Sequence, residues 1–423
     1  MIIIHNMTRP KYRPRALAAQ VERALKTHPV VVVSGSRQTG KTTLVQNLSS
    51  SEKREFITLD DLDALELARK RPEDLLARAE HLTIDEVQRV PELLLWIKRD
   101  VDRRRRRGRF LLTGSANLLL MREVADSLAG RAVYLLLSPF TGSEKRGEGG
   151  VPPWSQLLQC ATVGQVMDTF AGGRVADLDW RREILRGGMP RAVLSRTVSE
   201  RTSWFDGFIK TYLERDLRDL SQVASLPDFR RLMGLAVHRI GQLLNQSELG
   251  RDAGLSQVTT HRYLNLLEAS FQTHRLPGYW RNPSKRLIKA PKLYWRDCGI
   301  AAYLAGLKRM DDPQGSPLLG PLLENLVFSG ILAWRDATGA RSNAYYWRTA
   351  GGAEVDFVIE SGQRLLPIEV KTSKRIRLEA LRHLEIFLED YPRLAPFGVV
   401  LHDLDRPLAL TRHIVGLPVG GFV

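Results

Sequence analysis

A segment near the N-terminus has residues of the types, and at the spacing, found in loops that bind phosphate groups. Residues 35–42 read Gly-Ser-Arg-Gln-Thr-Gly-Lys-Thr, directly after four valines at 30–33 and before a helical pattern. The glycines let successive backbone N–H groups close around a β-phosphate, the lysine reaches the β and γ oxygens, and the threonine hydroxyl can ligate Mg²⁺. We therefore predict a loop that binds ATP and Mg²⁺ through Gly35, Gly40, Lys41, Thr42 and Thr43.

Further along, two apolar strands end in residues that suit phosphate hydrolysis. Asp85 and Glu86 follow the apolar segment 82–84, and Ser115 follows the apolar segment 110–112. Ligands bind at the carboxyl ends of parallel strands, so Asp85 can hold the Mg²⁺ ion and Glu86 can orient the attacking water. Ser115 is expected to sense the γ-phosphate. An ordinary pair of strand-end acids and a plain strand-to-loop turn are the structural alternatives.

Two sets of arginines could act on phosphates. Arg131 follows Gly130 just beyond the Ser115 strand and is a candidate arginine finger for the γ-phosphate of a neighbouring subunit, with a surface role as the alternative. An unbroken basic run precedes that strand. It is either the solvated end of a helix or a patch that contacts DNA phosphates, through Arg103, Arg104, Arg105, Arg106 and Arg107.

A third chemical pattern lies in the C-terminal part. Asp356 is followed thirteen residues later by Glu369-x-Lys371, within a helix–strand–strand–strand–helix–strand order at 318–401. Asp356 and Glu369 would project from adjacent strands as oxygen ligands for Mg²⁺, and Glu324 on the helix could add another ligand. Lys371 lies on the same strand face as Glu369 and could stabilise a phosphate. The alternative is a catalytically silent domain that only binds.

A helix, a glycine turn and a second helix at 258–267 indicate a helix-turn-helix. The second helix could enter a major groove, and the expected DNA contacts include Gln257, Thr260 and Arg262. The next stretch, 269–296, holds seven Lys or Arg and no acidic residue. Lys285 and Arg286 at its expected hairpin tip would lie on the phosphate backbone. Winged helices also serve as protein-docking modules and as parts of ATPase lids.

Composition limits the class of protein. The chain has 423 residues, which suits two to four domains, and its net charge of +16 indicates an anionic partner such as DNA. Cys160 and Cys298 lie far apart, which fits a reducing cytosol and excludes a cysteine zinc site. The apolar run at 2–4 is too short for a signal peptide, and no stretch approaches the ~20 apolar residues of a membrane span. We expect a cytoplasmic protein that does not enter a membrane.

The order of these motifs resembles the AAA+ ATPases, and the chain as a whole resembles a prokaryotic AAA+ family with a C-terminal DUF4143 domain. The resemblance is carried by residues 34–44, 84–88, 112–115, 128–131, 187–190, 212–216, 291–294, 354–357 and 368–371. It implies an α/β fold, with a P-loop ATPase core of parallel strands at 1–140 and a helical lid at 141–235. A winged helix-turn-helix domain would follow at 236–310 and an α/β domain at 311–423. The pattern of the last domain resembles the PD-(D/E)XK nucleases.

Three functions remain compatible with these patterns. The favoured one is an ATPase that uses ATP hydrolysis to remodel, or move along, duplex or branched DNA in repair or recombination, with a metal-dependent nuclease-like domain. Because arginine fingers act between subunits, this function implies self-association into a ring, expected to be a hexamer. The alternatives are a regulatory or defence ATPase, such as a toxin–antitoxin component, and a non-catalytic DNA-binding switch.

Overall fold

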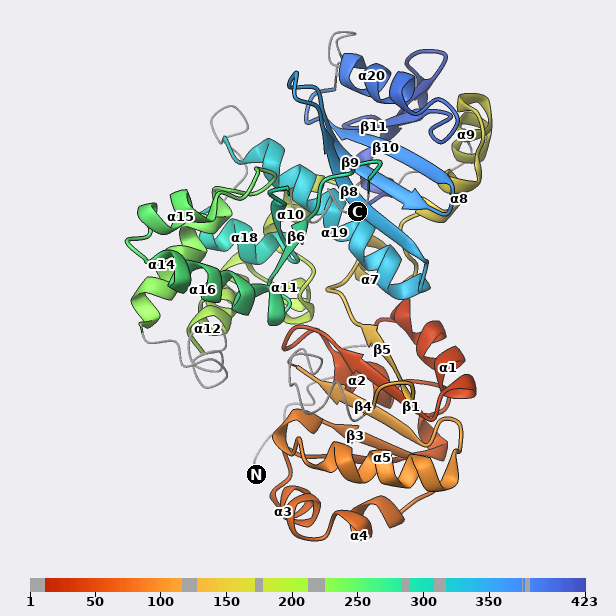
Figure 1. Cartoon of the computed structure of the whole chain (residues 1–423), viewed down its shortest axis with the longest axis vertical. Coiled ribbons are helices and arrows are strands. Elements are labelled where there is room, and N and C mark those ends of the chain that lie inside the picture. The colour runs from red at the N-terminus through yellow and green to blue at the C-terminus, as the bar shows by residue number, and fades with distance from the viewer. Residues whose placement is uncertain are drawn as a thin grey trace, which may run out of the picture.

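The computed structural model describes residues 12–115, 128–171, 178–211, 225–282, 289–307, 317–374, 376 and 381–423. Figure 1 shows the N-terminal sheet and its helices at one end of the molecule, with the helical middle region and a C-terminal sheet at the other. The predicted DNA contacts Lys285 and Arg286, and the segment 212–216, lie outside the described residues.

The N-terminal part is a parallel five-stranded sheet in the order β2-β3-β4-β1-β5. Its central strand is the valine run, in which Val30 and Val32 pack on one face and Val31 and Val33 on the other. β-Branched side chains buried on both faces are typical of parallel strands, so this part of the predicted fold is confirmed. The strands are β1 (Val30–Ser34), β2 (Glu55–Thr58), β3 (Leu82–Asp85), β4 (Phe110–Gly114) and β5 (Ala132–Leu136).

Helices cover both faces of this sheet (Figure 1). One face packs against α1 (Leu17–Thr27) and α2 (Lys41–Gln46). The other packs against α3 (Leu62–Lys70), α4 (Pro72–Ala77) and α5 (Leu93–Arg104). The short turns η1 (Ser51–Lys53) and η2 (Val87–Arg89) complete the domain. The parallel pairing brings the carboxyl ends of β1, β3 and β4 to one edge of the sheet, where the residues predicted to bind the nucleotide lie.

The middle region is helical, as expected. It comprises α7 (Gly142–Arg146), α8 (Trp154–Gln159), α9 (Val163–Phe170), α10 (Trp180–Arg186), α11 (Pro190–Leu194), α12 (Val198–Phe208), α14 (Leu226–Val237), α15 (Gln246–Asp252), α16 (Gln257–Ala269) and α18 (Cys298–Leu304). α15 and α16 lie at the position of the predicted helix-turn-helix, and the Ser256 side chain caps α16 by accepting a hydrogen bond from the Thr259 N–H. An antiparallel hairpin follows, made of β6 (Thr273–Leu276) and β7 (Lys292–Trp295).

Part of the segment expected in a lid packs elsewhere. The Trp334 indole N–H donates to Ser155 Oγ at 2.8 Å, and the Trp154 ring lies 4.8 Å from the Phe422 ring, centroid to centroid. Helix α9 also contacts two strands of the C-terminal sheet. Residues 154–170 therefore belong with the C-terminal part, because their apolar side chains complete its core.

The C-terminal part is a mixed six-stranded sheet in the order β12-β13-β11-β10-β9-β8. The expected element order is confirmed in α19 (Leu319–Thr338), β8 (Ser342–Arg348), β9 (Glu354–Ser361), β10 (Arg364–Val370), α20 (Arg382–Asp390) and β11 (Gly398–His402). The sheet is extended by β12 (Leu408–Ala409) and β13 (Ile414–Pro418), before a last turn, η6 (Val419–Gly421). Helix α19 lies in one apolar core with the middle region. None of the helices described is long and apolar enough to cross a membrane.

Candidate functional site

The loop of residues 35–42 has the close backbone packing that the motif predicts. A Cβ atom on Gly35 would lie 2.6 Å from the Leu137 carbonyl oxygen, so only glycine fits there. Gly40 has a φ of 91° at the start of α2. The Lys41 ammonium donates to the carbonyl oxygens of Gly35 at 3.1 Å and Ser36 at 2.9 Å. Burial lowers the pKa of Lys41 to about 8 because few water molecules can solvate its charge. A phosphate bound at this position would pair with the ammonium and stabilise its charged form.

Thr42 and Asp85 meet although they are 43 residues apart. The Thr42 hydroxyl donates to both carboxylate oxygens of Asp85 at 3.0 Å, and the Thr113 hydroxyl also donates to Asp85. Asp85 is 4% exposed at the end of β3. A hydroxyl beside a carboxylate is a donor set that suits Mg²⁺, so these two residues fit the predicted role of holding the ion. Thr43, on the next position of α2, is exposed.

Glu86 and Ser115 also lie together, joined by Gln88, a residue of the segment 84–88 to which the sequence analysis gave no role. The Gln88 amide donates to Glu86 Oε2, and to Ser115 Oγ at 3.0 Å, while Ser115 Oγ donates to Glu86 Oε2 at 3.4 Å. Glu86 has a φ of 56°, in the left-handed region that non-glycine residues rarely adopt and that often marks functional positions. Gln88 therefore holds the carboxylate that is expected to orient water.

Three distant side chains contact the phosphate loop. The Gln272 amide donates to Ser36 Oγ at 2.8 Å, and the Trp204 indole N–H donates to Gln38 Oε1 at 2.9 Å. Arg15 donates to the Thr39 carbonyl oxygen at 2.8 Å. These residues lie after α16, on α12 and before α1, and no local sequence signal marks them. The middle region thus contacts the nucleotide loop directly.

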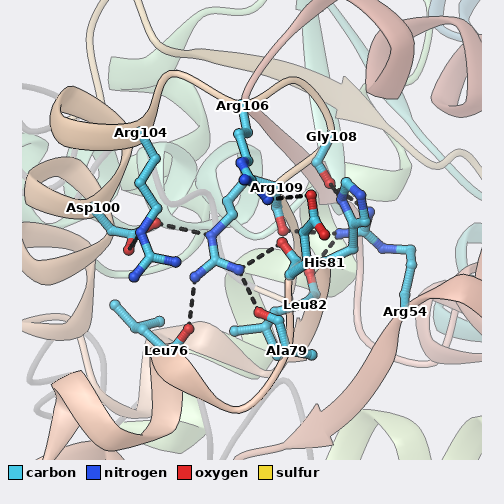
Figure 2. A network of polar contacts seen from close by, with 11 residues as sticks. Arg54, Leu76, Ala79, His81, Leu82, Asp100, Arg104, Arg106, Gly108 and Arg109 are labelled. Carbon is cyan, nitrogen blue, oxygen red and sulfur yellow. Dashed lines mark hydrogen bonds and ion pairs between the residues drawn. The ribbon is translucent and has the colours of Figure 1, made fainter.

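The five arginines of the basic run are all exposed but differ in their partners, and the buried Arg109 follows them; Figure 2 shows Arg104, Arg106 and Arg109 with the groups that they contact. Arg109, which is 1% exposed, donates to Asp100 Oδ2 at 2.9 Å and to the Leu76 carbonyl oxygen at 2.7 Å. Arg104 pairs with Asp100 at 3.3 Å, and Arg106 pairs with Glu80. The remaining three side chains are exposed and form no ion pair or hydrogen bond with the described residues; they are Arg103, Arg105 and Arg107.

Arg131 lies at the surface and binds within its own subunit. Its guanidinium donates to the two carboxylate oxygens of Asp102 at 2.6 and 2.9 Å. Both side chains are partly exposed, at 30% and 46% of the side-chain surface. Water and salt weaken an ion pair of this kind. The ion pair with Asp102 is therefore weak enough for Arg131 to leave it and bind another anionic group.

The second helix of the helix-turn-helix exposes only part of the predicted set. Gln257 and Arg262 are exposed, and Val258 beside them is 79% exposed. Thr260 is fully buried, and its hydroxyl donates to the Ser256 carbonyl oxygen at 2.9 Å. The prediction that Thr260 contacts DNA is therefore wrong in this arrangement, because this side chain packs α16 against Gly250 of α15.

Strands β9 and β10 bring Asp356 and Glu369 together. They pair antiparallel up to Ile368 opposite Phe357, and Asp356 Oδ2 accepts a hydrogen bond from the Val370 N–H at 2.8 Å. The Lys371 ammonium lies 2.5 Å from Glu369 Oε1, while the buried Glu369 Oε2 has no partner. Burial, and then the charge of Asp356, raises the pKa of Glu369 well above its ordinary value.

Strand β7 adds two side chains to this carboxylate cluster that the sequence patterns did not assign to it. Lys292, which is 2% exposed, lies 2.6 Å from Glu354 Oε1 and 3.5 Å from Glu324 Oε1. The Tyr294 hydroxyl donates to Glu324. Burial, and then the charge of Asp356, raises the pKa of Glu324. No three His, Cys, Asp or Glu side chains within the described ranges are arranged to hold a metal ion, so the cluster does not fit Mg²⁺ as it stands.

Known families cover most of the chain. An "AAA domain" matches residues 27–145, and the domains of unknown function DUF8612 and DUF4143 match 177–311 and 319–420. The uncharacterized protein Rv2008c of Mycobacterium tuberculosis is 33% identical over 361 residues, which are 84% of this chain and 73% of that protein. The chain belongs to the AAA-domain family with a C-terminal DUF4143 domain.

Two solved structures of ATP-related proteins resemble this chain at low sequence identity. The Walker-type ATPase paby2304 of Pyrococcus abyssi is 15% identical, with a TM-score of 0.41 over 70% of this chain and 99% of that chain. AMPPCP-bound DnaA from Aquifex aeolicus is 15% identical, with a TM-score of 0.28 over 59% of this chain and 86% of that chain. The AAA domain covers the loop of Lys41 and the strand ends of Asp85 and Ser115, so the protein is an AAA-type ATPase.

Proposed function

We propose that this ATPase couples ATP hydrolysis to the remodelling of duplex or branched DNA, or to movement along it. The observation that carries the proposal is the hydrogen bond from Gln272 to Ser36. Gln272 follows α16 by three residues, and both side chains are buried, at 2% and 5% exposure. The contact joins the helix best placed to meet DNA with the loop that would hold the triphosphate.

The hydrolytic roles follow from the geometry of the P-loop. Lys41 would exchange its two carbonyl acceptors for phosphate oxygens, and Thr42 with Asp85 would hold the Mg²⁺ ion that neutralises developing charge. Glu86, positioned by Gln88, would orient the attacking water, with Ser115 beside it as the γ-phosphate sensor. Positioning and electrostatic stabilisation supply most of the catalysis in phosphoryl transfer, and these side chains suit that task.

The DNA-binding surface would be built from exposed basic and polar side chains. The net charge of +16 favours an anionic polymer, and the exposed face of α16 offers Gln257 and Arg262 within a winged helix. The exposed arginines of the basic run, Arg103, Arg105 and Arg107, would contact phosphates and give affinity without sequence preference.

Ring assembly would complete the ATPase site. An AAA-type ring, which we propose to be a hexamer, would bring Arg131 of one subunit to the γ-phosphate of the next. The exposed pair with Asp102 can open at little cost, which leaves the guanidinium free to move to a phosphate.

The C-terminal domain would take part as a nuclease-like module of the PD-(D/E)XK type. The antiparallel pairing of β9 with β10 and the ion pair of Lys371 with Glu369 support this proposal, in which Lys371 would contact a DNA phosphate. Glu324, Asp356 and Glu369 would be its metal ligands in a metal-bound state.

The proposal is tested by ATP turnover of the purified protein with single-stranded, duplex, forked and four-way DNA. We expect at least one of the duplex or branched forms to raise turnover, and Gln272→Ala to lower the ratio of stimulated to basal rate. Gln242→Ala, an exposed glutamine of the same region, serves as the control. Turnover that no DNA changes would overturn the proposal. Growth arrest on expression, relieved by a neighbouring gene product, would then favour the regulatory or defence ATPase.

A further inference from the structure

The C-terminal carboxylate cluster contains a buried lysine from outside its own sheet. Lys292 comes from β7, which pairs with β6 in a separate two-stranded sheet. Its ammonium lies within 2.6 Å of Glu354 on β9 and 3.5 Å of Glu324 on α19, and it lies 5.7 Å from the centre of the Tyr346 ring. The lysine is therefore enclosed by acidic and aromatic groups of the domain that carries the candidate metal ligands.

Lys292 supplies positive charge to the buried carboxylates, which a bound metal ion would otherwise supply. The Lys292 ammonium lies between two carboxylates, 2.6 Å from Glu354 Oε1 and 3.5 Å from Glu324 Oε1, and so supplies a positive charge to the cluster. Buried carboxylates need a counter-charge, since an unpaired buried charge costs several kcal/mol. Lys371 provides a second ammonium on Glu369. The two lysines together provide two positive charges for the four carboxyl groups of the cluster, Glu324, Glu354, Asp356 and Glu369.

An ammonium ion at this position and a divalent ion exclude each other. Mg²⁺ requires near-octahedral oxygen ligands at about 2.0–2.1 Å, and it would compete for the Glu324 oxygen that faces Lys292. Two cations that share one carboxylate oxygen at such distances also repel each other. No three His, Cys, Asp or Glu side chains among the described residues are arranged to hold a metal ion.

We propose that Lys292 is an internal counter-ion that takes the place of the metal in the C-terminal domain, so that this domain binds a divalent ion only when the Lys292 side chain is withdrawn from the cluster. The inference concerns the nuclease-like domain alone. It is tested with Mn²⁺ in the absence of ATP and DNA, so its failure is distinct from a failure of the proposed DNA-dependent ATPase.

The test measures Mn²⁺ binding by electron paramagnetic resonance in nucleotide-free protein with Thr42→Ala, which weakens any ion site at the P-loop. We expect no Mn²⁺ site that depends on Asp356 while Lys292 is present. Lys292→Met keeps the apolar stem and should gain one Mn²⁺ site. Its affinity should exceed any Asp356-dependent Mn²⁺ affinity of protein that retains Lys292 by at least about tenfold, which corresponds to about 1.4 kcal/mol. That site should be lost again when Asp356→Ala is added.

Two controls keep the result decisive. Lys289→Met, at an exposed position three residues away, should gain no site. Lys292→Gln, which keeps a donor for Glu354, replaces Lys292→Met if that variant does not fold. An Asp356-dependent Mn²⁺ site in protein that retains Lys292, or a folded Lys292 variant that gains none, would overturn the proposal.

Discussion

The division of the basic run gives a quantitative prediction for DNA binding. Arg103, Arg105 and Arg107 are exposed and form no ion pair with the described residues, whereas Arg104 and Arg106 pair with Asp100 and Glu80. Replacing the three unpaired arginines together with alanine should weaken binding to all duplex sequences alike, because phosphate contacts carry no sequence information.

The magnitude follows from counterion release. Each phosphate contact contributes about 0.9 to the slope of log affinity against log salt on duplex DNA, so three lost contacts should flatten the slope by up to about 2.7. Fluorescence anisotropy with a labelled duplex over a series of KCl concentrations measures this slope. Circular dichroism of the same samples checks that the variant is folded.

The matched control is the double variant Arg104→Ala and Arg106→Ala, which removes arginines already bound to carboxylates. Its slope should change by less than half as much. An unchanged slope in the triple variant, or an equal change in both variants, would show that the unpaired arginines are solvated surface and would refute the reasoning.

Four single-residue variants give further predictions. Lys41→Ala should lose ATP binding, whereas Glu86→Gln should bind ATP and fail to hydrolyse it; normal phosphate release by Glu86→Gln would exclude the assigned role. Arg109→Met should lower the free energy of unfolding in urea by about 3–5 kcal/mol, because it leaves Asp100 without its buried partner; a loss below about 1 kcal/mol would contradict this. Burial, and then the charge of Asp356, raises the pKa of Glu369 from 4.5 to about 8 in the folded state, so between these pH values the native protein binds more protons than the unfolded chain and stability should fall as pH rises. Glu369→Gln should reduce that fall, and an identical pH profile would exclude Glu369 as its cause.

The parts of the fold that the sequence predicts well are those with a local pattern. The valines of β1 alternate between two cores, as a strand buried on both faces requires. Helical spacing places Thr260 on the same side as Leu264 and Leu267, both buried, so the correct orientation of Thr260 was already present in the pattern. The prediction failed there because residue type was weighed above periodicity.

Contacts between distant segments leave no such pattern. Gln272 and Ser36 are 236 residues apart, and a glutamine after a helix has many possible partners. The role of Arg109 was hidden in a run of similar arginines, since only the tertiary fold decides which of them is buried. Lys292 offered the one usable signal, a lysine that begins a strand whose other three residues are apolar or aromatic. Such a residue is expected to be paired when the strand is buried.

The contacts of β7 join the nucleotide loop to the carboxylate cluster. The Gln272 side chain donates to Ser36, and the Gln272 carbonyl oxygen accepts a hydrogen bond from the N–H of Arg296, the residue after β7, at 2.8 Å. Arg296 in turn pairs with Asp336 at 2.7 Å, on the same helix, α19, that carries Glu324. A shift of Ser36 on nucleotide binding would therefore act on the strand that holds Lys292.

Contacts alone transmit a change only if the joined elements have two arrangements, and the proposed withdrawal of Lys292 would supply the second one. If nucleotide binding favours that withdrawal, a metal ion in the cluster must tighten nucleotide binding by the same free energy, because equilibrium coupling between two sites is reciprocal. Lys292→Met removes the element that the two sites share, so in that variant the Mn²⁺ affinity of the cluster should no longer depend on nucleotide.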